Sequence, residues 1–325
     1  MKPAFAFLGL PLSALLLVCS SGAARVPETP VAASPTYGSP FWDHWGDGLA
    51  ELAGYDLTLA RYSAPRQGSA VTIFVTESFT NAERVKADGP GPDVFPVLKL
   101  NLVKDFPTGI YDYGLMTSTF VALESENGRP AGVPTKVSFS SQEWCGHAYQ
   151  QLLFDGAGKL RDVSHSYFQG EADQNRSLAA PNAATSEDAL FLWARGLAYP
   201  RVEPGESVAV PVALALDRSR LRHVEVGLEA ATLSRAAATR TVTVPAGSFE
   251  VRDAVAVVTG KTGARTWTFW VEVAAPHRLI GWETTEGERA ELLAATRLPY
   301  WKLNGPGGEA ELAKLGLAPR AKRST

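Results

Sequence analysis

Hydrophobic and polar residues alternate along much of this chain with the period of two that is typical of β-strands. In the segment FPVLKLNLVKDF at 95–106, Leu98, Leu100 and Leu102 fall on one face, while the lysine and asparagine between them fall on the other. Such alternation predicts a sheet with one dry side. By the same criterion, and by their content of β-branched and aromatic residues, extended segments are predicted at 70–79, 95–106, 114–125, 135–154, 159–171, 206–216, 223–234, 240–247, 248–260, 265–275, 277–284 and 289–298.

The connections between these segments are short, and several of them carry Gly or Pro. Closely spaced strands with local turns predict an antiparallel meander and not a parallel sheet with crossover helices. The sequence DGAG at 155–158 marks one such turn, so 135–171 is predicted to form one long antiparallel hairpin.

One helix interrupts this mainly β pattern. Ser186 can cap a helix, two acidic residues follow in the first turn, an apolar face comes next, and Gly196 provides a stop. These features predict a short helix over 187–195. Because so long a meander must cover or join its edges, we expect the sheet to curl into a barrel or half-barrel around this helix.

The N-terminal residues are typical of a secretory signal peptide, predicted at 1–24. Lys2 precedes an apolar run at 4–18, and small residues follow at 21–24, where cleavage is expected. Cys19 is an alternative site of lipid attachment, although the residue before it is not small as a lipobox requires. We therefore expect an exported protein, periplasmic or associated with the outer membrane; simple export is favoured over membrane attachment through lipid on Cys19.

The remaining chain divides by composition. Residues 25–40 are rich in Pro, Ser and Ala and predict a flexible tether. We expect one large β domain at 41–303, with 41–172 and 186–303 as its candidate halves. Residues 304–325 are predicted to be a tail that contains one short helix.

Composition narrows the function classes. Hydrophobic residues make up 45% of the 325 residues and charged residues 20%, as in a globular protein with a buried core. The net charge of −3 gives no field that would draw the chain to nucleic acid. No later stretch approaches 18 apolar residues, so we expect no transmembrane span in the mature chain. We also expect no cofactor, since the usual phosphate, zinc-protease, serine-hydrolase and C-x-x-C motifs do not occur.

The segment SSQEWCGHAY at 140–149 carries the candidate site. On a continuous strand, Glu143, Cys145 and His147 would share one face, and the returning strand would bring His165 and Tyr167 beside His147. Three interpretations follow: a thiol nucleophile with its base, a zinc site of imidazole and carboxylate, or a hydrogen-bonded polar face with a packed cysteine. The last is favoured, because a mid-strand cysteine gains no help from a helix N-terminus in forming thiolate.

Two parts of the chain resemble known families. GDGLAELAGYDLTLARYSAPRQG, FPVLKLNLVKDFPTGIYDYGLMTSTF and SSQEWCGHAY with SYFQGEA resemble a family of uncharacterised exported bacterial proteins, often lipoproteins, over about residues 41–172. Some members carry the label septum formation inhibitor Maf. True Maf proteins are cytoplasmic nucleotide pyrophosphatases of α/β fold. This chain has neither their basic phosphate motif nor their helix–strand alternation, so the label is not carried over.

The second resemblance covers TVTVPAGSFEVRDAVAVV and RTWTFWVEVAAPHRLIGWE, which are similar to the C-terminal half of a periplasmic β-domain family of unknown function. The resemblance implies a curved or barrel-like sheet, similar to the half-barrels that carry lipid in the envelope. We therefore expect an exported cell-envelope protein that binds an apolar ligand, such as a lipid, or an envelope component without catalysis. The alternative is a thiol-dependent hydrolase or transferase that uses Cys145 and His147, oriented by Glu143.

Overall fold

The computed structural model describes residues 32–261 and 263–319, which belong to one compact unit that begins at Ala32. The predicted signal peptide, Cys19 and the first part of the predicted tether lie outside the described residues.

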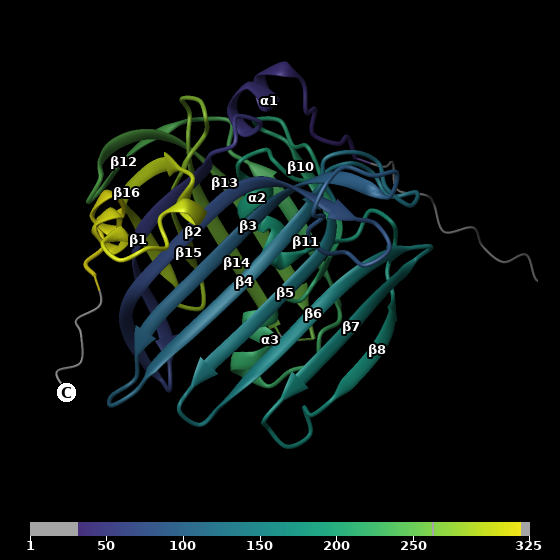
Figure 1. The fold of residues 1–325 in the computed structure, drawn as a ribbon, viewed down its shortest axis with the longest axis horizontal. Helices are drawn as coiled ribbons and strands as arrows, with labels where there is room; N and C mark the ends of the chain where they lie inside the picture. Colours follow the sequence, from purple (N-terminus) through teal and green to yellow (C-terminus); the bar gives the residue numbers. More distant parts are fainter. Residues whose placement is uncertain (1–31, 262, 320–325) are drawn as a thin grey trace, which may run out of the picture. The chain divides into compact units, whose positions relative to one another are not determined.

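The described residues form one 16-stranded sheet (Figure 1). Its strand order is β8-β7-β6-β5-β4-β3-β2-β1-β16-β15-β14-β13-β11-β10-β9, and β12 pairs with β13 off this path. The pairs are antiparallel except for the parallel pair β9–β10. The prediction of a mainly β, antiparallel meander is confirmed, but the sheet is not closed, since β8 and β9 stand at its two ends.

The strands fall into two runs joined side by side. The first run is β1 (Ala50–Arg61), β2 (Ala64–Thr80), β3 (Val94–Pro107), β4 (Asp112–Ala122), β5 (Pro134–Glu143), β6 (Gly146–Gly156), β7 (Lys159–Ser166) and β8 (Gln174–Ala179). The second is β9 (Thr185–Ser186), β10 (Ser207–Ala213), β11 (Leu228–Arg235), β12 (Arg240–Val244), β13 (Gly247–Gly260), β14 (Gly263–Glu272), β15 (Leu279–Thr284) and β16 (Arg289–Leu298). β1 pairs with β16 from Ala50↔Leu298 to Thr58↔Arg289, so one sheet contains both runs.

Helices are few and short. They are α1 (Ser39–Trp45), η1 (Glu187–Ala189), α2 (Leu190–Ala194), α3 (Leu216–Arg222), η2 (Tyr300–Lys302) and η3 (Gly308–Leu315). The helix predicted at 187–195 is confirmed as η1 followed by α2, and Ser186 Oγ accepts a hydrogen bond from the Asp188 N–H at 3.2 Å. No helix within 32–261 or 263–319 is long and apolar enough to cross a membrane.

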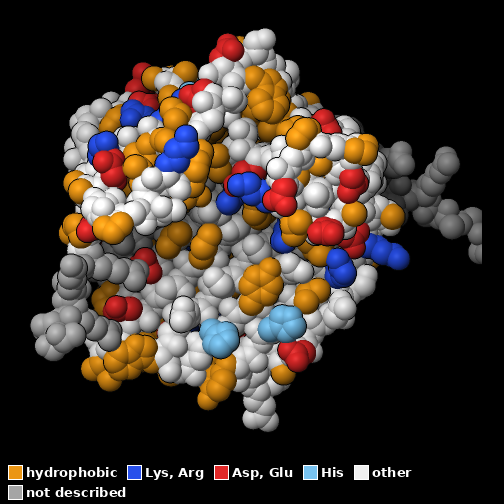
Figure 2. Space-filling view, in the orientation of Figure 1, with side chains coloured by type: hydrophobic (Ala, Val, Ile, Leu, Met, Phe, Trp, Pro, Cys, Tyr) orange, Lys and Arg blue, Asp and Glu red, His pale blue; other side chains and the backbone are white. Residues whose placement is uncertain are grey.

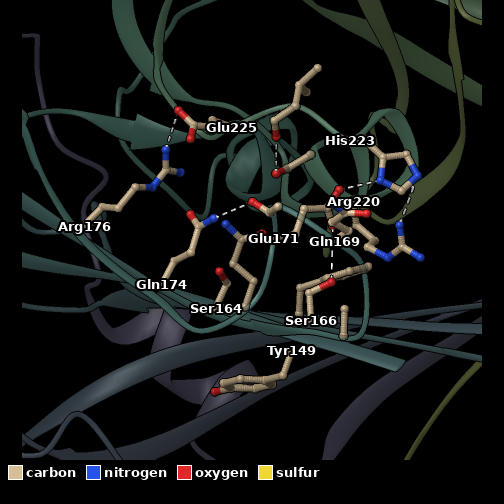
Figure 3. A pocket seen from close by; sticks show the side chains of 16 residues that line it. Tyr149, Ser164, Ser166, Gln169, Glu171, Gln174, Arg176, Arg220, His223 and Glu225 are labelled. Atoms are coloured by element: carbon tan, nitrogen blue, oxygen red, sulfur yellow. Dashed lines mark hydrogen bonds and ion pairs between the residues drawn. The ribbon is translucent and has the colours of Figure 1, made fainter. Parts of the chain in front are cut away.

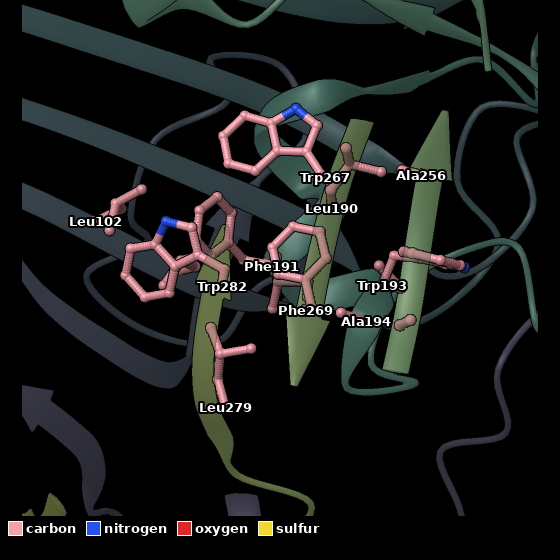
Figure 4. Close-up of a cluster of buried hydrophobic side chains, with 14 of the residues drawn as sticks. Leu102, Leu190, Phe191, Trp193, Ala194, Ala256, Trp267, Phe269, Leu279 and Trp282 are labelled. Atoms are coloured by element: carbon pink, nitrogen blue, oxygen red, sulfur yellow. The ribbon is translucent and has the colours of Figure 1, made fainter. Parts of the chain in front are cut away.

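The η1–α2 segment lies inside the curve of the sheet. η1 packs against β4, whereas α2 packs against β13 and β14, so one segment contacts both runs of strands. Phe191 of α2 meets Trp282, Phe269 and Trp267, with ring centroids 5.0, 5.1 and 5.7 Å apart (Figure 4). Burial of these large rings explains why so short a helix is stable, since each contributes well over 100 Å² of apolar area.

Several elements were not predicted from the sequence, among them α1, β1, β8 and α3. β1 was not predicted as a strand, β8 falls in a segment assigned to a loop, and α3 falls between two predicted strands. The N-terminal part of the described chain is also docked: Tyr37, within the predicted tether, donates a hydrogen bond to the carbonyl of Leu197 at 2.9 Å.

The C-terminal segment packs on the outer side of the sheet. η3, which lies in the segment predicted as a tail, crosses β1 at Gly54. A Cβ at Gly54 would lie 2.2 Å from the carbonyl oxygen of Leu315, so only glycine allows this approach. Leu315 is 5% exposed and joins a small apolar cluster with Leu52 and Val75.

Candidate functional site

The hairpin predicted for 135–171 contains one turn more than the sequence analysis gives it. β5 ends at Glu143 and β6 begins at Gly146, so Cys145 lies in a two-residue turn. Glu143 pairs with Gly146 across this turn. The prediction of one strand with Glu143, Cys145 and His147 on a shared face is therefore wrong, because the chain reverses direction between them.

This reversal separates the carboxylate from the imidazole. His147 lies directly opposite Gln142, so His147 and Glu143 point to opposite faces of the sheet. Glu143 is buried on the inner face, and His147 is exposed on the outer face.

The returning strand does lie beside His147, as predicted. The N–H of Tyr167 donates to the carbonyl of His147 at 3.3 Å, and His165 lies opposite Tyr149, two residues from His147. Their side chains are exposed, and histidine side chains lie among hydrophobic ones on this face (Figure 2). His165 Nδ1 also lies 2.7 Å from Asp173 Oδ1. His147, His165 and Tyr167 thus form a group on the outer surface.

The surroundings of Cys145 do not activate its thiol. The N–H of Cys145 donates to Glu143 Oε2 at 2.6 Å. Hydrogen bonding to Glu143, together with its negative charge, raises the pKa of the Cys145 thiol. A raised pKa leaves less thiolate at neutral pH, and thiolate is the nucleophile. The geometry therefore does not favour a thiol-dependent reaction at Cys145 and His147.

A metal site is not favoured either. Zinc requires several ligands that converge on one point, whereas Glu143 lies on the face opposite His147 and His165. Within the part of the chain that the structure describes, no group of three or more His, Cys, Asp or Glu side chains is placed to hold a metal ion.

A cavity of about 440 Å³ lies on the inner face of the same strands, between β5–β8 and α3 (Figure 3). Its polar lining includes Gln150, Ser164, Glu171, Gln174, Arg220 and His223. Tyr149, by contrast, points to the other side of the strands (Figure 3). We name this space the polar cavity.

Strand register builds the floor of the polar cavity. Phe139, Gln150, Ser164 and Gln174 lie directly opposite one another in one row across β5, β6, β7 and β8. The buried Asp162 fixes the Gln150 carboxamide, whose Nε2 donates to Asp162 Oδ1 at 2.8 Å. The three polar side chains of this row are only partly buried, so they can form hydrogen bonds with a molecule in the cavity.

Ion pairs form the opposite wall of the polar cavity. Arg176 of β8 reaches across to Glu225, with 2.8 Å between Nη1 and Oε2. His223 Nδ1 binds Glu171 Oε1, and its Nε2 lies 3.4 Å from Arg220 Nη1. His223 thus bridges the carboxylate of Glu171 and the guanidinium of Arg220. These contacts connect the β8 end of the sheet to α3.

A second cleft, of about 270 Å³, lies between α3 and the β1–β2 turn. Its wall includes Asp217 and Glu288, whose oxygens lie 2.9 and 2.8 Å from Nζ of the buried Lys104. Glu187, also in this wall, binds Arg265 and accepts a hydrogen bond from Trp267 Nε1 at 2.7 Å. These charges are paired with one another, so we assign this cleft a structural role.

The residues of the polar cavity on α3 were not predicted from the sequence. A signal for this helix exists, since Asp217 stands in its first turn and Arg220 and Arg222 stand in its last turn, where they favour the helix dipole. His223 ends the helix with a left-handed backbone (φ 54°).

Comparison with protein-family models, with curated proteins and with solved structures gives no match for this chain.

Proposed function

We propose that this protein binds a small polar ligand in the polar cavity and does not catalyse a reaction. The observation that carries this proposal is the inward-facing row of Gln150, Ser164 and Gln174, with Phe139 beside it, at a cavity of about 440 Å³. This volume is within the range of small-molecule sites. Carboxamides and hydroxyls that lie in one row suit a ligand with several hydrogen-bonding groups.

The ligand proposed here is polar, in contrast to the apolar ligand expected from the sequence. In this proposal the curved sheet acts as a half-barrel whose concave side is filled by α2, where Leu190, Phe191, Leu192 and Trp193 are all buried. The polar cavity lies beyond this plug, near α3, and its lining favours hydrogen bonds over apolar contacts.

The proposed setting is the cell envelope. The N-terminal sequence, with Lys2 and the apolar run at 4–18, supports export. Fractionation of the native cells, with mass determination of the mature N-terminus, tests this setting. A mature chain that begins after residue 19 indicates simple export, a lipid on Cys19 indicates attachment, and an intact N-terminus in the cytoplasm contradicts the proposal.

Native mass spectrometry of the full chain, purified from its own envelope, tests the binding function. A small polar molecule should accompany the wild-type protein, and Ser164→Phe, which fills the polar cavity, should lose it. Ser140→Phe places the same ring on the exposed outer face of β5 and should keep the ligand. Thermal unfolding checks that both variants are folded. Wild-type protein without any bound molecule, or equal retention by the two variants, contradicts the proposal.

A further inference from the structure

Arg220 is the least compensated charge in the polar cavity. It stands in the last turn of α3, is 6% exposed and lines the cavity. Its guanidinium stacks on Phe168, with Cζ 3.7 Å from the ring centroid. Among the described residues, its Nε has no hydrogen-bond partner, and Nη1 has only the His223 ring at 3.4 Å.

Most other buried arginines of the described chain bind a carboxylate, and Arg129 instead donates to three backbone carbonyls. Arg195 binds Glu51, with 2.6 Å between Nη1 and Oε1. Arg84 binds Glu126, with 2.7 Å between Nη2 and Oε1. A buried guanidinium without a carboxylate is costly, because stacking on an aromatic ring replaces only part of its lost hydration. Arg220 therefore has unused capacity to bind an anion.

The acidic groups at the cavity already have partners. Glu171 binds His223 and accepts a hydrogen bond from Ser166 Oγ at 3.3 Å, and Glu225 pairs with Arg176. They are thus engaged, whereas the guanidinium edge of Arg220 contacts only the His223 ring (Figure 3), and its buried Nε has no hydrogen-bond partner. An incoming carboxylate or phosphate would supply the charge-assisted acceptor that this edge lacks.

We propose that Arg220 anchors the anionic group of the ligand, and that the polar cavity takes a small acidic polyhydroxyl compound of the acidic-sugar class. This inference rests on the proposed binding function. The hydroxyl part of the ligand would lie along the Gln150–Ser164–Gln174 row. Because Nε2 of Gln150 donates to Asp162 and Nε2 of Gln174 donates to the carbonyl of Gly170, their amide oxygens remain as acceptors for ligand hydroxyls.

Calorimetric titration of the full chain tests this inference with a fixed panel of probes. The acidic probes are glucuronate, galacturonate and glucose 6-phosphate; the matched neutral probes are glucose and galactose; inorganic phosphate tests the anion alone. At least one acidic sugar should bind at least about 10-fold more tightly than its neutral counterpart, as expected for a hydrogen-bonded charge pair. Tighter binding of phosphate than of any sugar would show that the hydroxyl row contributes nothing, which overturns the ligand class.

Three variants distinguish a role of Arg220 in ligand binding from a role in folding. Arg220→Gln should weaken binding of the acidic sugar about 10- to 100-fold and abolish the preference over the neutral sugar. Arg220→Lys, which keeps the charge and guards against misfolding, should keep part of the preference. Arg222→Gln, on the exposed side of the same helix, should bind as the wild type does.

The outcomes distinguish this inference from the function on which it rests. If no acidic sugar binds, if neutral and acidic sugars bind equally, or if Arg220→Gln binds as the wild type does, the Arg220 inference is wrong. A native protein that still carries a polar molecule, lost on Ser164→Phe, would leave the binding function standing. Wild-type protein that carries no molecule would remove both.

Discussion

Arg195, at the end of α2, donates from Nη1 and Nη2 to the two carboxylate oxygens of Glu51 on β1, at 2.6 and 3.1 Å. This pair ties the interior helix to the first strand of the sheet. Burial alone would raise the pKa of Glu51, but the charge and hydrogen bonds of Arg195, with help from His44, lower it to about 2.

We predict that this ion pair makes stability depend on acid. The folded-state pKa of Glu51 lies below its unfolded value of about 4.3, so its contribution is present above that pH and is lost as the pH falls towards 2. Glu51→Gln, which leaves Arg195 unpaired, should lower the free energy of unfolding at pH 7 by about 3–5 kcal/mol. Urea unfolding between pH 2 and 7 measures both effects. Asp253→Asn, which removes an exposed pair with Arg240, is the control and should cost less than about 1 kcal/mol.

For Asp188 we predict that stability depends on pH in the opposite direction. Burial, with repulsion from Asp217, raises the pKa of Asp188 to about 8. Its contribution to stability is therefore complete below its unfolded pKa of about 4 and is lost as the pH rises through 8. Asp188→Asn should remove this loss and exceed the wild type in stability above pH 8, by about 1.4 kcal/mol for each pH unit over which the loss accumulates.

Unfolding in urea at pH 5, 7 and 9 checks the Asp188 prediction. Asp188→Ala is the contrasting variant. It removes the oxygen that accepts hydrogen bonds from Ser186 Oγ and the Leu216 N–H, so it should be less stable than Asp188→Asn at every pH. A parallel pH profile for wild type and Asp188→Asn would show that Asp188 is ionised in the fold.

The thiol of Cys145 should react slowly with alkylating reagents even though it is exposed. Glu143 raises its pKa, so the thiolate fraction at neutral pH is below that of a free cysteine. Glu143→Gln should increase the labelling rate at pH 7 several-fold and move the pH profile of labelling to lower pH. A native rate faster than that of a cysteine peptide would contradict this view and revive a thiol-dependent reaction.

The close approach of η3 to Gly54 predicts a steric effect. Gly54→Ala places a methyl group 2.2 Å from the carbonyl oxygen of Leu315, so η3 must move away from β1. The variant should lose about 1–3 kcal/mol of stability, and proteases should cut the C-terminal segment faster. Gly89→Ala is a matched control, because a Cβ at Gly89 meets nothing within 4 Å. Equal proteolysis of the two variants would show that η3 does not depend on this contact.

Strand periodicity predicted most of the sheet, because half-buried strands alternate clearly. The segment predicted at 289–298 has the bounds of β16, and Leu98, Leu100 and Leu102 are buried as expected. β8 was not predicted because its sequence, QNRSLA, has polar residues on both faces. This edge strand is stabilised by pairing with β7 and by the ion pair of Arg176 with Asp162. Stabilisation by residues outside the strand gives no hydrophobic periodicity within the sequence of β8.

The prediction of the candidate site was wrong because the sequence gives only weak signals for the turn between β5 and β6. Neither Trp144 nor Cys145 has a positive φ, so the turn lacks the Asn-Gly or Gly signature of tight hairpins. Its remaining signals are Gly146 and the carboxylate of Glu143, which accepts the N–H of Cys145. The polar cavity could not be predicted at all, because its walls come from β5–β8 and from α3, and even the nearest of these strands, β8, is separated from α3 by more than 30 residues of sequence.

The pairing of β1 with β16 has a consequence for how the chain acquires its structure. Thr58 meets Arg289 across more than 200 residues of sequence, so β1 waits for its second neighbour until nearly the whole polypeptide is present. Contacts of such sequence separation form slowly, and an unpaired strand edge meanwhile invites association with other chains. A chain that is synthesised from its N-terminal end therefore leaves this edge of β1 unpaired until β16 is present.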